Sequence, residues 1–476
     1  MRLRSLLTAA FMLGTAPSPA LAAEEKVYTG VTVLDPLTKR RSPDSYIVVR
    51  GSRIAAIGRG RLPRRYAGAE QSDMTGRFAM PGLFDTHAHV TVGPLVMSRV
   101  DGKPSAMMQG DATMTRHDAL MLLAHGVTTI RDPGGDTARM VAYRNAVAAG
   151  RLIGPEAKVA GGVIDHPPFP TKGLVDSVTE ARPVATVVQQ QVAAGVDYVK
   201  LYEGLRADEL KAGIDAAHAA GVTTIAHLSN VSWTKAADMG IDSLVHAMPL
   251  SPDLLSGEHK AAYLKTKRPG GWDFYRWYEE VDLDGPEIGA MIATLARRKV
   301  PLDATLIVFR QAFWGNDRPM RDADLAYANP SLVRDWTTTL SFDKGWFADD
   351  YRRAKAVWPK VLRFVRMLHE AGVPLTIGTD MNNPFVAPGV SVAREAALHV
   401  DAGIPAWEVL QMATANAARL LKVDDRTGRL RTGMQADILF LSADPSVDIH
   451  ALTDVVGVVE NGRFHLPADL EQEARR

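Results

Sequence analysis

Short apolar runs with the composition of buried β-strands alternate with helical stretches through the middle of the chain. This alternation is typical of parallel β/α units, in which each helix returns the chain to the start of the next strand. Eight such strands are recognisable, and eight units predict a (β/α)8 TIM barrel. The predicted strands lie at Leu83, Thr128–Arg131, Lys158–Ala160, Tyr198–Leu201, Thr223–Ala226, Ser243–Val245, Leu302–Leu306 and Leu375–Gly378.

The two ends of the chain have a different character, because strand-like runs separated by turn signals replace the β/α alternation. Residues 23–80 contain runs such as Tyr46–Val49, and residues 428–476 contain Val455–Val459. Neither end is long enough for a comfortable domain of its own. We therefore predict an α/β protein in which both ends form one small composite β-sandwich domain and residues 81–427 form the barrel.

Six polar residues stand at the ends of predicted strands: His87, His89, Lys200, His227, His246 and Asp380. The active site of a (β/α)8 barrel lies at the carboxyl ends of its strands. His87 and His89 are two positions apart, so both side chains lie on the same face of an extended chain. Imidazole and carboxylate groups bind divalent transition metals such as zinc. The chain has no cysteine, so thiolate ligands are excluded, and the pattern predicts a metal-dependent hydrolase.

Lys200 is the unusual member of this set, because a buried ammonium group is costly unless it is paired or neutralised. Three interpretations compete. The amine could form an ion pair, it could be a Schiff-base nucleophile, or it could react with carbon dioxide to give an anionic carbamate that bridges two metals. The neighbouring histidines and aspartate favour the carbamate, since a Schiff-base lyase needs no histidine cluster.

Further residues are candidates for acid–base chemistry and substrate contact. Asp380 is predicted both to hold a metal and to carry a proton between water and a leaving amine. Tyr202 shares the inward face of Lys200, and His166 follows a predicted barrel strand, so both are predicted substrate contacts. Arg310 follows the seventh strand and either meets a substrate carboxylate or lies on the surface.

Two long connections interrupt the later β/α units, at residues 247–286 and 309–352. They contain five of the eight tryptophans, namely Trp272, Trp277, Trp314, Trp336 and Trp346. Long ordered loops are usually functional. The sequence leaves open whether these segments cover the substrate, form a subunit interface in a homo-oligomer, or pack against the barrel wall.

The first residues have the pattern of a secretory signal peptide. Two arginines precede an apolar segment from Leu6 to Ala16, and Ala20-Leu21-Ala22 supplies a cleavage site. We therefore expect residues 1–22 to be removed from an exported protein, periplasmic or secreted, with no membrane attachment afterwards. Cleavage removes two arginines and leaves a net charge of −1. Such a near-neutral chain offers no electrostatic basis for nucleic-acid binding.

Several longer motifs resemble the amidohydrolase superfamily, in particular its imidazolonepropionase-like and Xaa-Pro dipeptidase (prolidase)-like members. The resemblance spans residues 27–463. Its motifs are PGLFDTHAH from Pro81, GVTTIRD from Gly126, DYVK from Asp197, ATANAA from Ala413 and GMQAD from Gly433.

The resemblance implies a barrel with one or two metals, usually zinc, beside a small β-sandwich. It assigns the first metal to His87, His89 and Asp380, and the second to His227 and His246, with carboxylated Lys200 as the bridge. It implies hydroxide attack on an amide carbonyl, with Asp380 as general base and then acid. The expected substrate is a dipeptide (Xaa-Pro or Xaa-basic) or an N-acyl amino acid. Cyclic amides, lactones and acylated xenobiotics are the alternative within the same chemistry.

Overall fold

The computed structural model describes residues 25–166, 171–267, 274–338 and 345–476. The predicted signal segment, residues 1–22, and Trp272 lie outside these ranges. Within them, no helix combines the length and the hydropathy that a membrane-spanning segment requires.

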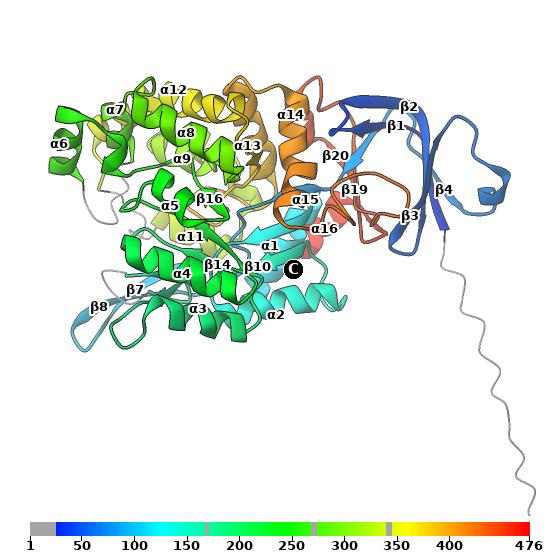
Figure 1. Cartoon of the computed structure of the whole chain (residues 1–476). Helices are drawn as coiled ribbons and strands as arrows, with labels where there is room; N and C mark the ends of the chain where they lie inside the picture. Colours follow the sequence, from blue (N-terminus) through cyan, green and yellow to red (C-terminus); the bar gives the residue numbers. More distant parts are fainter. Residues whose placement is uncertain (1–24, 167–170, 268–273, 339–344) are drawn as a thin grey trace, which may run out of the picture.

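The predicted (β/α)8 barrel is confirmed, and its strands lie at the centre of the larger lobe in Figure 1. Neighbouring strands pair in parallel, in the orders β6–β9–β10 and β14–β15–β16–β17–β18. Main-chain hydrogen bonds join these two groups at both edges, from Asp197 N to Val159 O and from Thr86 N to Ile377 O, each 2.8 Å. The barrel strands are β6 (Leu83–Asp85), β9 (Val127–Asp132), β10 (Glu156–Val159), β14 (Tyr198–Leu201), β15 (Thr223–Ala226), β16 (Ser243–Val245), β17 (Leu302–Asp303) and β18 (Leu375–Thr376).

Helices surround these strands, and several of them are strongly amphipathic. In α8, for example, Ile288, Met291, Ile292 and Leu295 are buried, which is the spacing of one helical face. Pro286 occupies the first turn of that helix, where its missing N–H costs nothing. The surrounding helices are α1 (Ala112–Ala124), α2 (Thr137–Ala148), α3 (Val184–Ala193), α4 (Ala207–Ala219), α5 (Trp233–Met239), α8 (Pro286–Arg298), α12 (Ala348–Glu370), α13 (Val390–Asp401), α14 (Ala406–Gln411) and α15 (Ala417–Leu420).

The two long connections are largely helical. Trp277 and Trp336 are buried, and the ring of Trp346 packs on Tyr275 with 5.2 Å between centroids. Trp314 packs on Trp358 of α12 and Trp336 packs on Phe385, so the described tryptophans of these segments pack the added helices on one another and on the barrel. Those helices are α6 (Gly257–Thr266), α7 (Tyr275–Glu280), α9 (Leu306–Phe313), α10 (Arg318–Arg321) and α11 (Pro330–Thr338).

Strands from both ends of the chain form one eight-stranded sheet in the order β21-β20-β19-β5-β1-β2-β3, with β4 beside β1. β19 pairs antiparallel with β5, which leads directly into the first barrel strand. Tyr28, Phe440 and Phe464 pack together on one face of this sheet. Its strands are β1 (Glu25–Asp35), β2 (Arg40–Arg50), β3 (Arg53–Arg59), β4 (Glu70–Asp73), β5 (Phe78–Pro81), β19 (Ile438–Leu441), β20 (Val455–Glu460) and β21 (Arg463–His465).

The remaining elements are short additions to this frame. After His89 the chain forms a hairpin of β7 and β8, and β8 also pairs in parallel with the short strand β12. The final helix packs against α1 (Figure 1). These additions are β7 (Leu95–Val100), β8 (Lys103–Met108), β11 (Val163–Asp165), β12 (Thr171–Lys172), β13 (Val175–Ser177) and α16 (Pro467–Ala474).

Candidate metal centre

The six polar residues predicted at strand ends meet at one end of the barrel. Each is at least nine-tenths buried. The four histidine rings form a continuous group. The centroid separations are 5.4 Å between His87 and His89, 4.8 Å between His87 and His246, and 4.5 Å between His246 and His227. Residues far apart in the sequence therefore share one small volume, because the strands that carry them are parallel neighbours.

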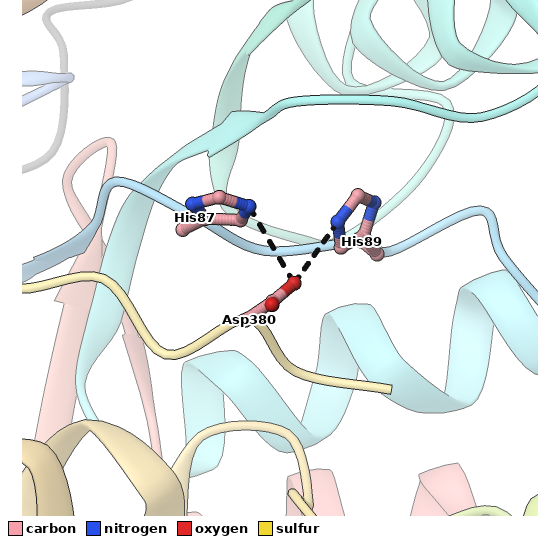
Figure 2. Close-up of side chains that lie close together, drawn as sticks. All are labelled: His87, His89 and Asp380. Atoms are coloured by element: carbon pink, nitrogen blue, oxygen red, sulfur yellow. Dashed lines mark ion pairs between the residues drawn. The ribbon is translucent and has the colours of Figure 1, made fainter. Parts of the chain in front are cut away.

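His87, His89 and Asp380 form the first ligand group (Figure 2). One Asp380 oxygen lies 3.1 Å from His89 Nε2 and 3.5 Å from His87 Nε2. The ligand atoms of the three residues all lie within 4.8 Å of one another. The other ring nitrogen of His89 donates to the carbonyl oxygen of Gly134 at 2.7 Å, which orients the ring. Two imidazoles and a carboxylate so placed match the donor set of a divalent metal.

His227 and His246 lie beside this group. Nδ1 of His246 is hydrogen-bonded to Thr305 Oγ1 at 2.7 Å. Both ring nitrogens of His227 are buried and have no hydrogen-bond partner in the described part of the chain. An unpaired buried polar atom costs roughly 1–3 kcal/mol, so it calls for an explanation. A metal ion would take the lone pair of one of these nitrogens, and His246 beside His227 offers a second imidazole, so the residues present fit a second metal.

Lys200 lies between the two groups. Its Nζ is 3.2 Å from His87 Nε2 and 5.5 Å from the ring centroid of Tyr202. Burial lowers the pKa of this amine to about 8, although the charge of Asp380 acts in the opposite direction. A larger fraction of Lys200 is therefore the neutral, nucleophilic amine at neutral pH than of a lysine in water.

The surroundings hold the other groups in the protonation states that ligands need. Burial by itself would raise the pKa of Asp380, but His87, His89 and Lys200 hold it at about 2, so the carboxylate is ionised. Burial lowers the pKa of His227 to about 3. It lowers the pKa of His87 and His246 in the same direction. Neutral imidazole is the metal-binding form.

The backbone is strained where it carries these side chains. The backbone φ angles of His246, Thr305 and Asp380 are 66°, 46° and 60°. They lie in the left-handed region, which residues other than glycine rarely adopt. Such strain persists only where the surrounding structure imposes it, and it is concentrated at functional sites.

A cavity of about 320 Å³ opens over the metal centre, and Tyr202 and Glu203 form part of its wall. The Tyr202 ring packs on His227, with 4.7 Å between centroids. The apolar part of the wall comes mainly from the segments that follow barrel strands and from the two long connections. Those apolar residues include Val92, Leu95, Met108, Val163, Leu174, Phe274, Val308, Phe309 and Leu332.

The other two predicted contacts have different surroundings. Nε2 of His166 lies 2.9 Å from the carboxylate of Glu209 in α4, and His166 is not among the described residues that line the cavity. The guanidinium of Arg310 stacks on the ring of Trp314 at 3.9 Å. Sequence reasoning missed Glu203 and Phe309, although each directly extends a strand-end segment that it had already identified.

Comparisons with known proteins point to one superfamily. Residues 337–465 match the family model described as the amidohydrolase family. An imidazolonepropionase from Cupriavidus taiwanensis is 33% identical over 112 residues, a match that covers 22% of this chain and only 26% of that enzyme.

Two solved structures extend the similarity over nearly the whole chain. One is a Xaa-Pro dipeptidase with methionine in its active site, with a TM-score of 0.68 and 19% identity over 93% of this chain and 100% of the other. Another is a bottromycin amidohydrolase, with a TM-score of 0.67 and 25% identity over 94% of this chain and 88% of the other.

The fold and the site together define a (β/α)8 barrel with a candidate metal centre at the carboxyl ends of its strands. Residues 337–465 match the amidohydrolase family model, and over nearly the whole chain the fold is similar to that of the two solved structures.

Proposed function

We propose that this protein is a binuclear metal-dependent hydrolase that cleaves an amide bond. The observation that carries the proposal is His227, whose two buried nitrogens have no partner in the described part of the chain, beside a His87–His89–Asp380 group. One isolated metal ligand set would leave His227 and His246 unexplained. Two adjoining sets account for all four imidazoles.

His87, His89 and Asp380 would hold one ion, and His227 and His246 the other. Lys200, as a carbamate, would bridge them. The position of Lys200 beside His87 Nε2 supports this role, as does its lowered pKa, because the neutral amine is the form that reacts with carbon dioxide. When bound, divalent ions, which we propose to be zinc, would lower the pKa of a water molecule and polarise the substrate carbonyl.

Asp380 would then move the proton. Its carboxylate is ionised and faces both His87 and His89, so it is available to accept a proton from water at the reacting carbonyl. The same oxygen would deliver that proton to the departing nitrogen, which must be protonated to leave as an amine.

The substrate we propose is a dipeptide, Xaa-Pro or Xaa-basic, or an N-acyl amino acid. Tyr202 lies in the cavity wall within reach of the centre, where its hydroxyl can orient a polar group of the substrate. Glu203, next to it, offers a carboxyl group to a basic side chain. Burial raises the pKa of Glu203, so a cationic partner would favour its ionised form.

The apolar remainder of the wall, including Val163, Phe309 and Leu332, supports a second candidate. Cyclic amides, lactones or acylated xenobiotics would bury apolar surface there and could be cleaved with the same residues. A lyase that uses Lys200 as a Schiff-base nucleophile is the distant alternative, since it has no use for the histidines.

The test is hydrolysis of a panel by mature protein supplied with zinc. The panel contains Xaa-Pro, Xaa-Arg and Xaa-Lys dipeptides, N-acyl amino acids, cyclic amides, lactones and acylated anilides. We expect release of the amine product, loss of activity with a chelator and recovery with zinc. Activity that survives complete metal removal, together with borohydride trapping at Lys200, would support the lyase and overturn the hydrolase.

A further inference from the structure

Asp303, at the end of β17, is completely buried beneath the metal centre and contacts a predicted ligand. Its Oδ1 accepts a hydrogen bond from Nδ1 of His87 at 2.8 Å, and its Oδ2 accepts one from the guanidinium of Arg131. Arg131 is itself 2% exposed. Neither residue was identified as part of the site from the sequence.

Arg131 is held by partners from several barrel strands. Its Nε donates to the carbonyl oxygen of Thr86 at 2.7 Å, and its Nη1 donates to Ser243 Oγ at 3.2 Å. Its guanidinium lies 5.8 Å from the ring centroid of Tyr198. These contacts leave the guanidinium no freedom to turn away from Asp303, so one carboxylate oxygen is committed to Arg131 and the other faces His87.

This geometry determines which nitrogen of His87 carries the proton. The guanidinium of Arg131, hydrogen-bonded to Asp303, favours the ionised carboxylate, which only accepts hydrogen bonds, so Nδ1 of His87 is the N–H. Nε2 then presents a lone pair, and it is Nε2 that faces Lys200 Nζ and Asp380. Hydrogen bonds of this kind set the tautomer and orientation of metal-binding histidines.

The same strand end also contacts His246. The main-chain N–H of His246 donates to the carbonyl oxygen of Asp303 at 2.7 Å, and Thr305 Oγ1 is bonded to His246 Nδ1. Asp303 and Thr305 are therefore not among the proposed metal ligands, but they contact two residues that are, His87 and His246.

We propose that Asp303, anchored by Arg131, is a positioning residue that holds His87 as the Nδ1–H tautomer with Nε2 directed into the metal centre. The role in metal binding rests on the function proposed above. The tautomer of His87 in the metal-free protein does not depend on that function.

The test is Asp303→Asn, which preserves shape. Because Arg131 requires an acceptor, the amide oxygen of the new side chain should face Arg131 and its NH2 should donate to His87 Nδ1. His87 would then carry its proton on Nε2, which can no longer bind metal. We expect zinc affinity, measured by competition with a chromogenic chelator, to fall 10–100-fold. We also expect the His87 tautomer, read from long-range ¹H–¹⁵N correlations in metal-free protein, to change.

Asp437→Asn is the matched control, since Asp437 is a buried aspartate that accepts hydrogen bonds from Thr427 and the main-chain N–H of Asn461, outside the metal centre. It should leave zinc affinity within about twofold and the tautomer unchanged. Wild-type zinc affinity or an unchanged tautomer in Asp303→Asn would overturn the proposal.

If that variant does not fold, the wild type still decides: a metal-free His87 protonated on Nε2 overturns the proposal, and one protonated on Nδ1 supports it. A wild type that binds no zinc would instead refute the proposed function, and the tautomer measurement would still stand.

Discussion

The amine nitrogen of Lys200 lies 3.2 Å from Nε2 of His87, at the boundary between the two groups of histidines. This is the position from which a carbamate could reach both groups, and it is also the position in which an ordinary ammonium would be surrounded by histidines. Burial lowers the pKa of Lys200 to about 8, so the reactive neutral amine is accessible without a dedicated base.

Replacing Lys200 tests the bridge. Lys200→Ala should lose one of two zinc ions and most activity, because the variant cannot form the carbamate that we propose to bridge the ions. Short carboxylic acids such as propionate should partly restore both by standing in for the carbamate. Metal content and turnover check this, with Lys211→Ala on the exposed face of α4 as a control. Full activity without added acid would refute the carbamate.

Asp380→Asn removes the group that we propose to carry the proton. Turnover should fall at least roughly a hundredfold, because general acid–base groups typically contribute about 10²–10⁴-fold. The amide keeps an oxygen near His87 and His89, so the fold should persist, and the melting temperature checks that it does. Turnover equal to that of the wild type would show that the proton travels by another route.

Glu203→Gln separates the substrate classes. If Glu203 binds a basic side chain, kcat/KM for an Xaa-Arg dipeptide should fall about tenfold or more, because an unpaired buried charge is costly. Hydrolysis of a substrate with a neutral side chain, measured with the same enzyme preparation, should change little. An equal fall for both substrates would mean that Glu203 supports the wall and does not select the side chain.

The histidine cluster should make metal-free protein sensitive to acid. His227 has its pKa lowered from 6.5 to about 3 by burial, with Lys200 acting in the same direction. Between pH 6.5 and 3 the unfolded chain therefore binds a proton that the folded site excludes. The free energy of unfolding should fall as the pH falls, by about 1.4 kcal/mol per pH unit at most for one such group.

Thermal melts of metal-free protein between pH 7.5 and 5 measure this slope. His227→Gln should flatten it, whereas replacement of the exposed His450 should leave it unchanged. Identical slopes in wild type and His227→Gln would show that this imidazole is protonated in the fold.

We also propose that the protein is exported after removal of residues 1–22. Mature protein recovered from its native host, or from a host with a general secretory system, should begin near Ala23. Intact mass and amino-terminal sequencing check this, and Ala22→Trp, which blocks the small-residue cleavage site, should retain the leader. A mature chain that begins at Met1 would refute cleavage.

Much of the barrel could be predicted because its signals are local. The strand predicted at Tyr198–Leu201 is β14 (Tyr198–Leu201), and the one predicted at Ser243–Val245 is β16 (Ser243–Val245). Each depends on apolar spacing along a single segment. The helices of the long connections were not predicted, and the aromatic contacts that hold them, such as Trp346 with Tyr275 and Phe313, form only in the fold.

The sequence by itself determined that polar residues of metal-binding type follow successive strands, because a strand and the residue after it are covalent neighbours. Only the tertiary structure decided that His166 lies beside Glu209, that Phe309 and Leu332 form the wall, and that Asp303 meets His87. Those relationships depend on the distances between strands and helices that are remote in sequence. Such distances exist only after the barrel closes and buries Arg131 among its strands.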